Sequence, residues 1–313
     1  MSETEYSGFE IREATHDDYE GVAAIAAQTW DGDDYLTDVY HDWLDGEQRH
    51  TLVGTVGDDV AGIAQIVMLS PHEAWGQGLR TAPAHRGKGI SEAITYELFD
   101  WAREQGAVVS RAMVYSWNQA GLGQSRSTGY EPVTEFRWIR PEPMSGALPA
   151  SVSCDPDAAW GYWTGSDAAQ SLSGLTLSMD ESWAVQELTP ALLDRAADET
   201  SVLTVADGDG THGFAYRSRT FERETDGGEV ETWAEYGVAA WDSLDSARTV
   251  VEAIRVDAAD CGADRTRVLI PETAGYVSDG AYIRANIGDE PDFVVAADLT
   301  ADYRRDRPTP RSR

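Results

Sequence analysis

Three consecutive segments limit the choice of fold more than any other part of the chain. Residues 74–81 alternate like a strand that Pro83 ends, and residues 91–105 carry apolar side chains at helical spacing. Gly106 ends this helix, and residues 108–115 form a second apolar, strand-like stretch. Strand, glycine-containing loop, helix and strand in this order predict an α/β or α+β fold in which helices flank a sheet.

The segments on both sides of this unit continue the alternation of strands and helices. Residues 57–59, Gly-Asp-Asp, have the composition of a tight turn, so the apolar runs before and after them predict a hairpin. Residues 15–18 have the residue types of a helix start. The remaining expected elements are strands over residues 9–12, 51–56, 60–69 and 130–139 and a short helix over residues 120–127.

The second half of the chain repeats this order of elements. Residues 183–188 match the opening strand, and residues 246–261 match the long helix, with Gly262 in the place of Gly106. We therefore expect a tandem protein in preference to two unrelated α+β domains. Its expected parts are a first domain over residues 1–143, a connector over residues 144–180, a second domain over residues 181–303 and a disordered tail over residues 304–313.

The loop between the first long helix and the strand before it has the residue types that bind linked phosphates. It reads Arg86-Gly87-Lys88-Gly89-Ile90-Ser91. Its glycines let the backbone turn tightly and approach a ligand, and the free amides of a helix start can face an anion. The positive end of the helix and the two basic side chains then favour a pyrophosphate.

Other phosphate-binding loops fit this segment less well. A nucleotide P-loop needs a Ser or Thr after its lysine, whereas Gly89 follows Lys88, and no glycine lies five residues before Gly87. A dinucleotide fingerprint needs a third glycine, and Glu92 lies in that position. A strand-to-helix turn that holds no ligand remains an alternative for the loop taken by itself.

Taken with its surroundings, the loop resembles the coenzyme A loop of the GNAT (Gcn5-related N-acetyltransferase) superfamily, which reads [QR]-x-x-G-x-[GA]. Arg86 and Gly89 fit this pattern, and Ser91 replaces its final small residue. The similarity extends over residues 9–140. Its other supports are the opening strand over residues 9–15, Thr81-Ala82-Pro83 before the loop, Asn118, and Gly129-Tyr130.

The resemblance implies tandem acyl-CoA N-acyltransferase folds, each with a mixed sheet that splays at its fourth strand. Acetyl-CoA would bind as a cosubstrate, and no metal or other cofactor is implied. The main chain of Leu79, Arg80 and Thr81 would contact the pantetheine arm. Residues 86–91 would hold the pyrophosphate, and Asn118 matches a further coenzyme A-binding position of the family.

The implied reaction is direct transfer of an acetyl group to an amine acceptor, either a small molecule or a peptide. The amine loses a proton, attacks the thioester carbonyl and releases a thiolate. Glu73, just before the fourth strand, is the candidate base, with a solvated loop position as the alternative interpretation. Ser125 lies where the family often has the tyrosine that protonates the sulfur, so Tyr115 and Tyr130 are alternative proton donors.

The charge of the chain excludes some partners and indicates an environment. The formal net charge is -31, and Lys88 is the one lysine among 24 basic residues. A nucleic acid would be repelled by such a chain. Molar salt screens its self-repulsion, which favours a halophile protein over an acidic protein from an ordinary cytoplasm.

Other classes of protein are excluded by what the chain lacks. It has no apolar run long enough to cross a membrane and no secretory signal at its start, so we expect a cytoplasmic protein. Its histidines are scattered, which gives no metal site, and Cys154 and Cys261 are expected to be buried small hydrophobes. A homodimer is left open by the sequence.

The second half lacks the features of the phosphate-binding loop. The corresponding segment, residues 240–246, has no glycine and no basic residue and includes Asp242 and Asp245. We therefore expect the second half not to bind coenzyme A, and either to cover the acceptor site or to pack against the first half. The chain as a whole is interpreted as an N-acetyltransferase. The alternatives are a non-catalytic acyl-CoA-binding or regulatory protein on the same fold, and a purely structural module.

Overall fold

The computed structural model describes residues 4–6, 8–29, 34–225, 227–301 and 303 of the chain. The expected disordered tail over residues 304–313 lies outside the described residues. The chain divides into two compact units. Unit 1 contains the residues up to Pro132 together with those from Val295 onward, and unit 2 contains Val133–Val294. The chain passes between the units along two strands, β7 (Glu131–Ile139) and β15 (Asp292–Asp298).

Unit 1 contains the strands and helices that the sequence pattern predicts, together with β1 and α2. Besides β7 and β15, the strands of this unit are β1 (Thr4–Tyr6), β2 (Phe9–Glu13), β3 (Arg49–Val56), β4 (Asp59–Met68), β5 (Glu73–Thr81) and β6 (Val109–Tyr115). Its helices are α1 (Tyr19–Ala26), α2 (Leu36–Trp43), α3 (Ile90–Glu104) and α4 (Gln119–Ser127), with 3-10 turns η1 (His16–Asp18) and η3 (Pro83–His85). Leu36, Tyr40 and Trp43 are buried at helical spacing, and this was the available signal for α2.

The strands of unit 1 form a mixed sheet in the order β1-β2-β3-β4-β5-β6-β15. Strands β2 to β5 are antiparallel neighbours, and β5 and β6 are parallel. The β5–β6 ladder stops after Trp75, which pairs with Arg111. Residues 76–81 and 112–115 lie beyond the end of this ladder and are mostly half-buried, whereas residues 73–75 are buried. This is the splayed mixed sheet that the resemblance implies.

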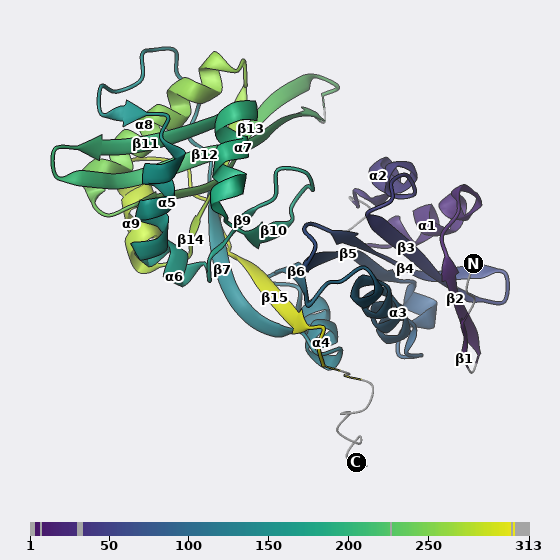
Figure 1. Ribbon diagram of the computed structural model, residues 1–313. Helices are drawn as coiled ribbons and strands as arrows, with labels where there is room; N and C mark the ends of the chain where they lie inside the picture. Colours follow the sequence, from purple (N-terminus) through teal and green to yellow (C-terminus); the bar gives the residue numbers. More distant parts are fainter. Residues whose placement is uncertain (1–3, 7, 30–33, 226, 302, 304–313) are drawn as a thin grey trace. The chain divides into compact units, whose positions relative to one another are not determined.

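Helices cover both faces of the unit 1 sheet (Figure 1). Leu52 and Phe99 belong to a core that includes α3. The next residue along β3, Val53, belongs to a second core with Tyr40 and Ile63, which includes α1 and α2. Because successive side chains of a strand point to opposite faces, we call these the α3 face and the α2 face.

Unit 1 is completed by strand β15, which comes from a distant part of the chain. The strand order places β15 beside β6, and the N–H of Leu299 donates to the carbonyl of Val108 at 2.9 Å. Val295, Ala297 and Leu299 are buried in the core that includes α3. Arg103 of α3 donates from Nε to the carbonyl of Leu299 at 2.6 Å, which fixes the end of β15 to that helix.

Unit 2 repeats much of the element order of unit 1. Its strands are β8 (Val152–Ser153), β9 (Leu175–Leu177), β10 (Val185–Glu187), β11 (Ser201–Asp207), β12 (Gly210–Glu224), β13 (Val230–Trp241) and β14 (Arg265–Pro271). Its helices are α5 (Pro156–Gly165), α6 (Asp167–Ser171), α7 (Pro190–Glu199), α8 (Leu244–Asp260) and α9 (Ala274–Tyr282). The sheet order is β7-β14-β13-β12-β11-β8, and β9 pairs with β10 separately. As with β5, α3 and β6, helix α8 connects two parallel neighbours, β13 and β14.

The segment interpreted as a connector, residues 144–180, contains regular secondary structure. It contains β8, α5, α6 and β9, all within unit 2. Asp155 caps α5 by accepting from the N–H of Ala158 at 2.9 Å, and Trp163 of this helix is buried. The many Gly, Ala and Ser residues of this segment hid the helical period, because they contribute few large apolar side chains to it.

Three simpler expectations can be compared with the described residues. None of the described helices has the length and apolar character needed to cross a membrane. The described part of the chain holds no group of three or more His, Cys, Asp or Glu side chains placed to bind a metal ion. Cys154 is exposed and Cys261 is half-buried, so the expectation of two buried thiols is wrong.

Candidate functional site

The loop that joins β5 to α3 is exposed and has the backbone conformation of an anion cradle. Gly87 and Gly89 adopt φ values of +75° and +85°, which residues with a side chain rarely adopt. A Cβ built on either glycine would meet no atom within 4 Å. Gly89 is the N-cap of α3, and no side chain of the described residues caps this helix. The first-turn amides therefore have no side-chain acceptor at the N-cap, which is the arrangement of a helix start that binds an anion.

Ile90 fixes the start of α3 against the sheet. Its side chain is 1% exposed, and its Cγ2 lies 2.5 Å from the position of a Cβ on Gly54 and 3.1 Å from one on Gly62. The two glycines are direct partners in the β3–β4 ladder. Together they give the helix room to approach the sheet, which holds the loop at the carboxyl end of β5. Sequence reasoning missed this pair, although both glycines lie within predicted strands.

The basic residues of the loop lie on the surface. Lys88 Nζ is 3.0 Å from Nδ1 of His85, and Arg86 is exposed. Ser91 lies in the first turn of α3, and its carbonyl accepts from Thr95 Oγ1 at 2.8 Å. The predicted pyrophosphate-binding residues are therefore brought together in one continuous turn. Their contacts with a ligand stay a prediction.

Strand β5 carries a bulge in the region where main-chain contacts were predicted. Its pairing with β4 shifts between the pair Gln65–Gln77 and the pair Ile63–Arg80. Gly78, within the shift, adopts φ +66°. A bulge takes backbone groups out of the regular ladder. This strand segment therefore has irregular pairing on the β4 side and lies beyond the ladder end on the β6 side.

The three residues predicted to contact the pantetheine arm, Leu79, Arg80 and Thr81, lie at this end of β5. Leu79 packs against the core that includes α3. The Arg80 side chain lies toward α2, where its Nε donates to Asp34 at 2.8 Å and its guanidinium lies over Tyr35, 5.5 Å from the ring centroid. The Asp34 side chain is 0% exposed. Sequence reasoning missed this ion pair, which ties the start of α2 to β5.

Asn118 lies at the same sheet edge as the loop, because the carboxyl ends of parallel strands meet at one edge. It is the N-cap of α4, and its Oδ1 accepts from the N–H of Gly121 at 2.9 Å. The residue is half-buried. Its side-chain oxygen therefore shapes the helix start, and its contact with coenzyme A stays a prediction.

Glu73 lies at the paired end of β5. Its Oε1 accepts from Arg111 Nη1, and its Oε2 accepts from Ser70 Oγ at 3.1 Å. Both Glu73 and Arg111 are buried. Glu73 is therefore a buried strand residue that bonds with Arg111 and Ser70, and not a solvated loop residue. Arg111, which sequence reasoning missed, supplies the charge that allows a carboxylate to be buried there.

The candidate proton donors occupy different environments. Ser125 is buried on α4, and its carbonyl accepts from the N–H of Tyr130 at 3.0 Å. The Tyr130 hydroxyl is 2.9 Å from Ser110 Oγ and 2.8 Å from the position of a Cβ on Gly76. Gly76 is the first residue of β5 beyond the ladder end, so this hydroxyl lies where the strands begin to diverge. Burial raises the pKa of the Tyr130 hydroxyl, which keeps it protonated at neutral pH.

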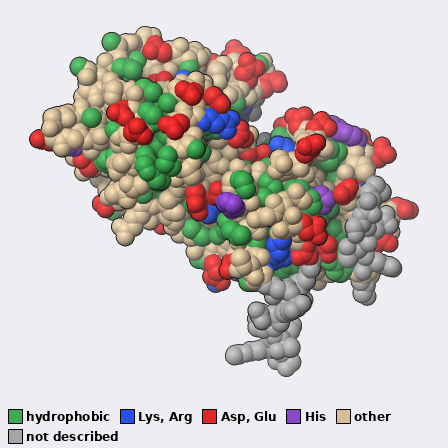
Figure 2. Space-filling view, in the orientation of Figure 1, with side chains coloured by type: hydrophobic (Ala, Val, Ile, Leu, Met, Phe, Trp, Pro, Cys, Tyr) green, Lys and Arg blue, Asp and Glu red, His purple; other side chains and the backbone are tan. Residues whose placement is uncertain are grey.

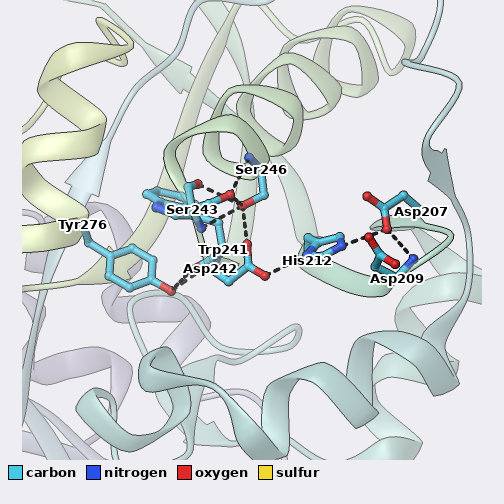
Figure 3. Close-up of polar contacts among 8 residues, drawn as sticks. All are labelled: Asp207, Asp209, His212, Trp241, Asp242, Ser243, Ser246 and Tyr276. Atoms are coloured by element: carbon cyan, nitrogen blue, oxygen red, sulfur yellow. Dashed lines mark hydrogen bonds and ion pairs between the residues drawn. The ribbon is translucent and has the colours of Figure 1, made fainter.

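Unit 2 closes the corresponding helix start with its own side chains (Figure 3). Ser243 is the N-cap of α8, and its Oγ accepts from the N–H of Ser246 at 3.2 Å, while Ser246 Oγ accepts from the N–H of Ser243 at 3.0 Å. Asp242 accepts from Ser246 Oγ at 2.9 Å. A capping box and a carboxylate therefore lie at the start of α8, whereas the start of the corresponding helix of unit 1, α3, has no side-chain cap.

His212 links this helix start to the turn between β11 and β12 (Figure 3). Its Nδ1 is 2.8 Å from Asp242 Oδ2, and its Nε2 is 3.0 Å from Asp207 Oδ1. Ionised carboxylates only accept hydrogen bonds, so the arrangement favours the imidazolium form with two donors. Hydrogen bonds to Asp242 and Asp207 accordingly raise the pKa of His212.

The parallel strands of unit 2 also differ from β5 and β6. Their ladder includes the pair Glu235–Arg267, and the side chains of these residues form a buried ion pair across it. Tyr216 lies over Gly237 of β13, with Cζ only 2.1 Å from the position of a Cβ there. Its hydroxyl is 2.6 Å from Thr176 Oγ1. Side chains of unit 2 therefore fill the space beside β13 and β14.

Part of unit 1 is similar in sequence to known acetyltransferases. Residues 10–123 match the model of the Acetyltransferase (GNAT) family. Over this stretch the sequence is similar to that of GNAT acetyltransferases. Histidine N-acetyltransferase of Xenopus tropicalis is 30% identical over 87 residues, which cover 28% of this chain and 27% of that protein. Probable N-acetyltransferase 16 of Homo sapiens is 33% identical over 79 residues, 25% of this chain and 21% of that protein. The chain thus matches about a quarter of the length of these relatives.

Solved structures extend the likeness to the fold of the whole chain. A GCN5-related N-acetyltransferase from Sphaerobacter thermophilus has a TM-score of 0.57 at 15% identity, covering 95% of this chain and 97% of that chain. A protein from Pyrococcus horikoshii described as an acetyltransferase has a TM-score of 0.51 at 16% identity, covering 94% and 91%. The fold is that of GNAT acetyltransferases.

Proposed function

We propose that the protein is an N-acetyltransferase that takes its acetyl group from acetyl-CoA bound to unit 1. The observation that carries the proposal is the uncapped start of α3, with positive φ at Gly87 and Gly89, beside a parallel strand pair that splays after Trp75. The helix start supplies amides for linked phosphates, and the splay exposes strand edges to an extended arm. Leu79, Arg80, Thr81 and Asn118 then lie at the edge that this arm would cross.

The proposed reaction uses groups along the β5–β6 ladder, with Glu73 in its first pair and the Tyr130 hydroxyl beside its end at Gly76. The amine nitrogen attacks the thioester carbonyl carbon, the C–S bond breaks, and coenzyme A leaves as a thiolate. Glu73, fixed by Arg111, takes the proton of the amine directly or through a water molecule. The Tyr130 hydroxyl, hydrogen-bonded to Ser110, supplies the proton that the thiolate takes up. Ser125 remains the second candidate for this donor, because it lies where the family often has the tyrosine that protonates the sulfur.

The acceptor is an amine, and free histidine is the first compound to test. The relatives named Histidine N-acetyltransferase match part of unit 1, and their name is the support for this choice. The alternative is a non-catalytic acyl-CoA-binding protein on the same fold. The start of α8 in unit 2 is capped by its own side chains. This supports a single acetyl-CoA site per chain, in unit 1, and a non-catalytic role for unit 2.

Thiol release tests the proposal directly. Purified protein in molar KCl is mixed with acetyl-CoA and an amine panel, and free coenzyme A is measured with a thiol reagent. We expect release that depends on an amine and that disappears when Gly89 is replaced by Val, because β-branched residues rarely adopt the φ of +85° found there. Binding of acetyl-CoA by calorimetry without any release would favour the non-catalytic alternative. Absence of both would contradict the donor site itself.

The acidic surface supports the proposal that the protein works in the cytoplasm of a halophile. Figure 2 shows acidic side chains spread over the visible face of both units, with few basic ones among them. With a formal net charge of -31, the folded chain repels itself unless salt screens the charges. A homodimer is a further proposal, which analytical ultracentrifugation in molar salt would test.

A further inference from the structure

The bulge of β5 changes which face of the sheet its side chains reach. Gln77, before the bulge, donates from Nε2 to Gln65 Oε1 at 2.8 Å, and Gln65 donates to the carbonyl of Trp43 at the end of α2, also at 2.8 Å. Gln77 therefore lies on the α2 face. Arg80, three positions further, would point to the α3 face in a regular strand. It bonds with Asp34 beside α2 instead, because the bulge shifts the alternation by one residue.

Helix α2 packs directly on the bulge. The ring of Trp43 lies over Gly78, with Cη2 2.2 Å and Cζ3 2.5 Å from the position of a Cβ there. Leu36, at the other end of α2, lies 3.5 Å from the same point through its Cδ2. Both side chains are buried. The φ of +66° and the ring above it therefore both require a residue without a side chain at this point of β5.

The guanidinium of Arg80 joins the start of α2 to the main chain of β5. Its Nε donates to Asp34 Oδ2 at 2.8 Å, and its Nη1 donates to the carbonyl of Leu79 at 3.2 Å. Asp34 Oδ1 accepts from the N–H of Leu36 at 3.2 Å, which places the carboxylate against the first turn of α2. The Asp34 side chain is fully buried, so salt in solution screens this ion pair little. The direction of the Leu79 carbonyl is therefore fixed from α2.

We propose that Asp34 and Trp43 are positioning residues for the acetyl donor, which hold the bulged end of β5 in the conformation that receives the pantetheine arm of acetyl-CoA. The inference rests on the proposed function, because the main chain of residues 79–81 is the proposed contact of that arm. Asp34 acts through Arg80, and Trp43 acts through Gly78, without contact to the donor. A strand that already has its binding conformation loses little conformational entropy when the ligand binds.

Binding of two ligands separates this role from a general effect on stability. One is acetyl-CoA, and the other is a fragment that keeps its nucleotide and linked phosphates but lacks the pantetheine arm. Calorimetry in molar KCl measures the Kd of each. The double variant Asp34→Asn with Arg80→Met removes both charges, so neither is left buried without its partner. We expect the Kd for acetyl-CoA to rise about tenfold, while the Kd for the fragment stays within about twofold.

Two further variants test the same contacts separately. Arg80→Lys keeps the charge that pairs with Asp34 but lacks the planar fork that reaches a carboxylate and a carbonyl at once. We expect it to fold like the parent and to raise the Kd for acetyl-CoA about threefold, and it decides the question if the double variant does not fold. Trp43→Leu removes the ring over Gly78 and should weaken acetyl-CoA without weakening the fragment.

A matched control comes from another ion pair of unit 1. Arg12 bonds with the buried Asp18 at 2.6 Å, at the start of α1. Arg12→Met should lower the thermal midpoint and leave both Kd values unchanged, whereas Gly89→Val should weaken both ligands. Folded variants of Asp34, Arg80 and Trp43 that bind acetyl-CoA like the parent, or that lose both ligands equally, would overturn the positioning role. Those results leave the donor site intact, whereas a parent protein that binds neither ligand would contradict the proposed function as well.

Discussion

The hydroxyl of Tyr130 occupies the space that a side chain on Gly76 would need. Its oxygen lies 2.8 Å from the position of a Cβ on that glycine and 2.9 Å from Ser110 Oγ. A side chain at Gly76 would therefore clash with the Tyr130 hydroxyl. This hydroxyl lies where the β5–β6 ladder ends. This close approach links the core that includes α3 to the proposed site of thiol release.

Replacing Gly76 with Ala should push the Tyr130 hydroxyl out of place. We expect the free energy of unfolding to fall by about 1–3 kcal/mol, as for other overpacked positions. Adding Tyr130→Phe should recover part of this loss, because the clashing oxygen is then absent. Urea denaturation of the two variants in molar KCl measures both effects. A Gly76→Ala protein as stable as the parent would show that the two groups do not compete for space.

Tyr130→Phe alone tests the proposed proton donor. We expect kcat to fall by about 100-fold, at the lower end of the range for a lost acid–base group, while the KM for acetyl-CoA changes little. The loss should be smaller for a donor thioester with a more acidic thiol, since such a thiolate leaves without protonation. Ser125→Ala is the matched control, and a larger loss in that variant would move the donor role to Ser125.

Glu73→Gln tests the proposed base and also breaks a buried ion pair. The substitution removes the carboxylate from the buried ion pair with Arg111, and loss of one partner of such a pair costs about 3–5 kcal/mol in comparable cases. The double variant Glu73→Gln with Arg111→Met removes that penalty and should fold more stably than the single variant. We expect both to have low kcat, because neither can accept the amine proton. A double variant with the activity of the parent would exclude Glu73 as the base.

The bridge of His212 should make the start of α8 sensitive to pH. The hydrogen bonds to Asp242 and Asp207 raise the pKa of His212 in the folded chain. The stability that protonated His212 adds to the fold is therefore fully present below the unfolded pKa of about 6.5. It is lost as pH rises through the pKa of His212 in the folded chain. Hydrogen bonds lower the pKa of Asp207 and Asp242, so their contribution is present above about 3.8 and is lost as pH falls below it. The bridge should therefore be strongest between about pH 4 and 6.5.

Hydrogen exchange measures this dependence at defined amides. We expect exchange at residues 207–212 and 242–246 to accelerate between pH 6 and 9 by more than the intrinsic rate increases. The variant His212→Gln should remove the extra acceleration. An NMR titration of His212 that gives an unshifted pKa would contradict the bridge.

Salt should stabilise the whole chain. Raising KCl from about 0.1 M to 1 M shortens the Debye length from about 10 Å to about 3 Å, which screens repulsion among the acidic side chains. We expect the thermal midpoint to rise over this range. Sodium chloride should act similarly, since screening depends on ionic strength. A midpoint that falls or stays constant would argue against adaptation to high salt.

The sequence was most informative where a single residue type decides a local conformation. The glycines of residues 86–91 and the apolar period of residues 91–105 predicted the loop and the helix that carry the candidate donor site, and the splay followed from the resemblance. Residues whose importance depends on a distant partner were not predictable in this way. The resemblance pointed to Glu73, but its partner Arg111 lies 38 residues away and is not distinctive in its own segment, so their ion pair was not predictable. Asp34 is one of many acidic residues, and only its burial against Arg80 sets it apart.

Strand β15 has a consequence for how the protein is made. It lies beside β6, and Arg103 bonds the carbonyls of Leu299 and Ala301 just beyond it. A ribosome therefore finishes nearly all of unit 2 before the sheet that bears the candidate donor site can receive its last strand. Until then the edge of β6 stays unpaired, which is the kind of surface that invites wrong partners. Synthesis of this chain thus includes an interval in which unit 1 waits for a segment made long after it.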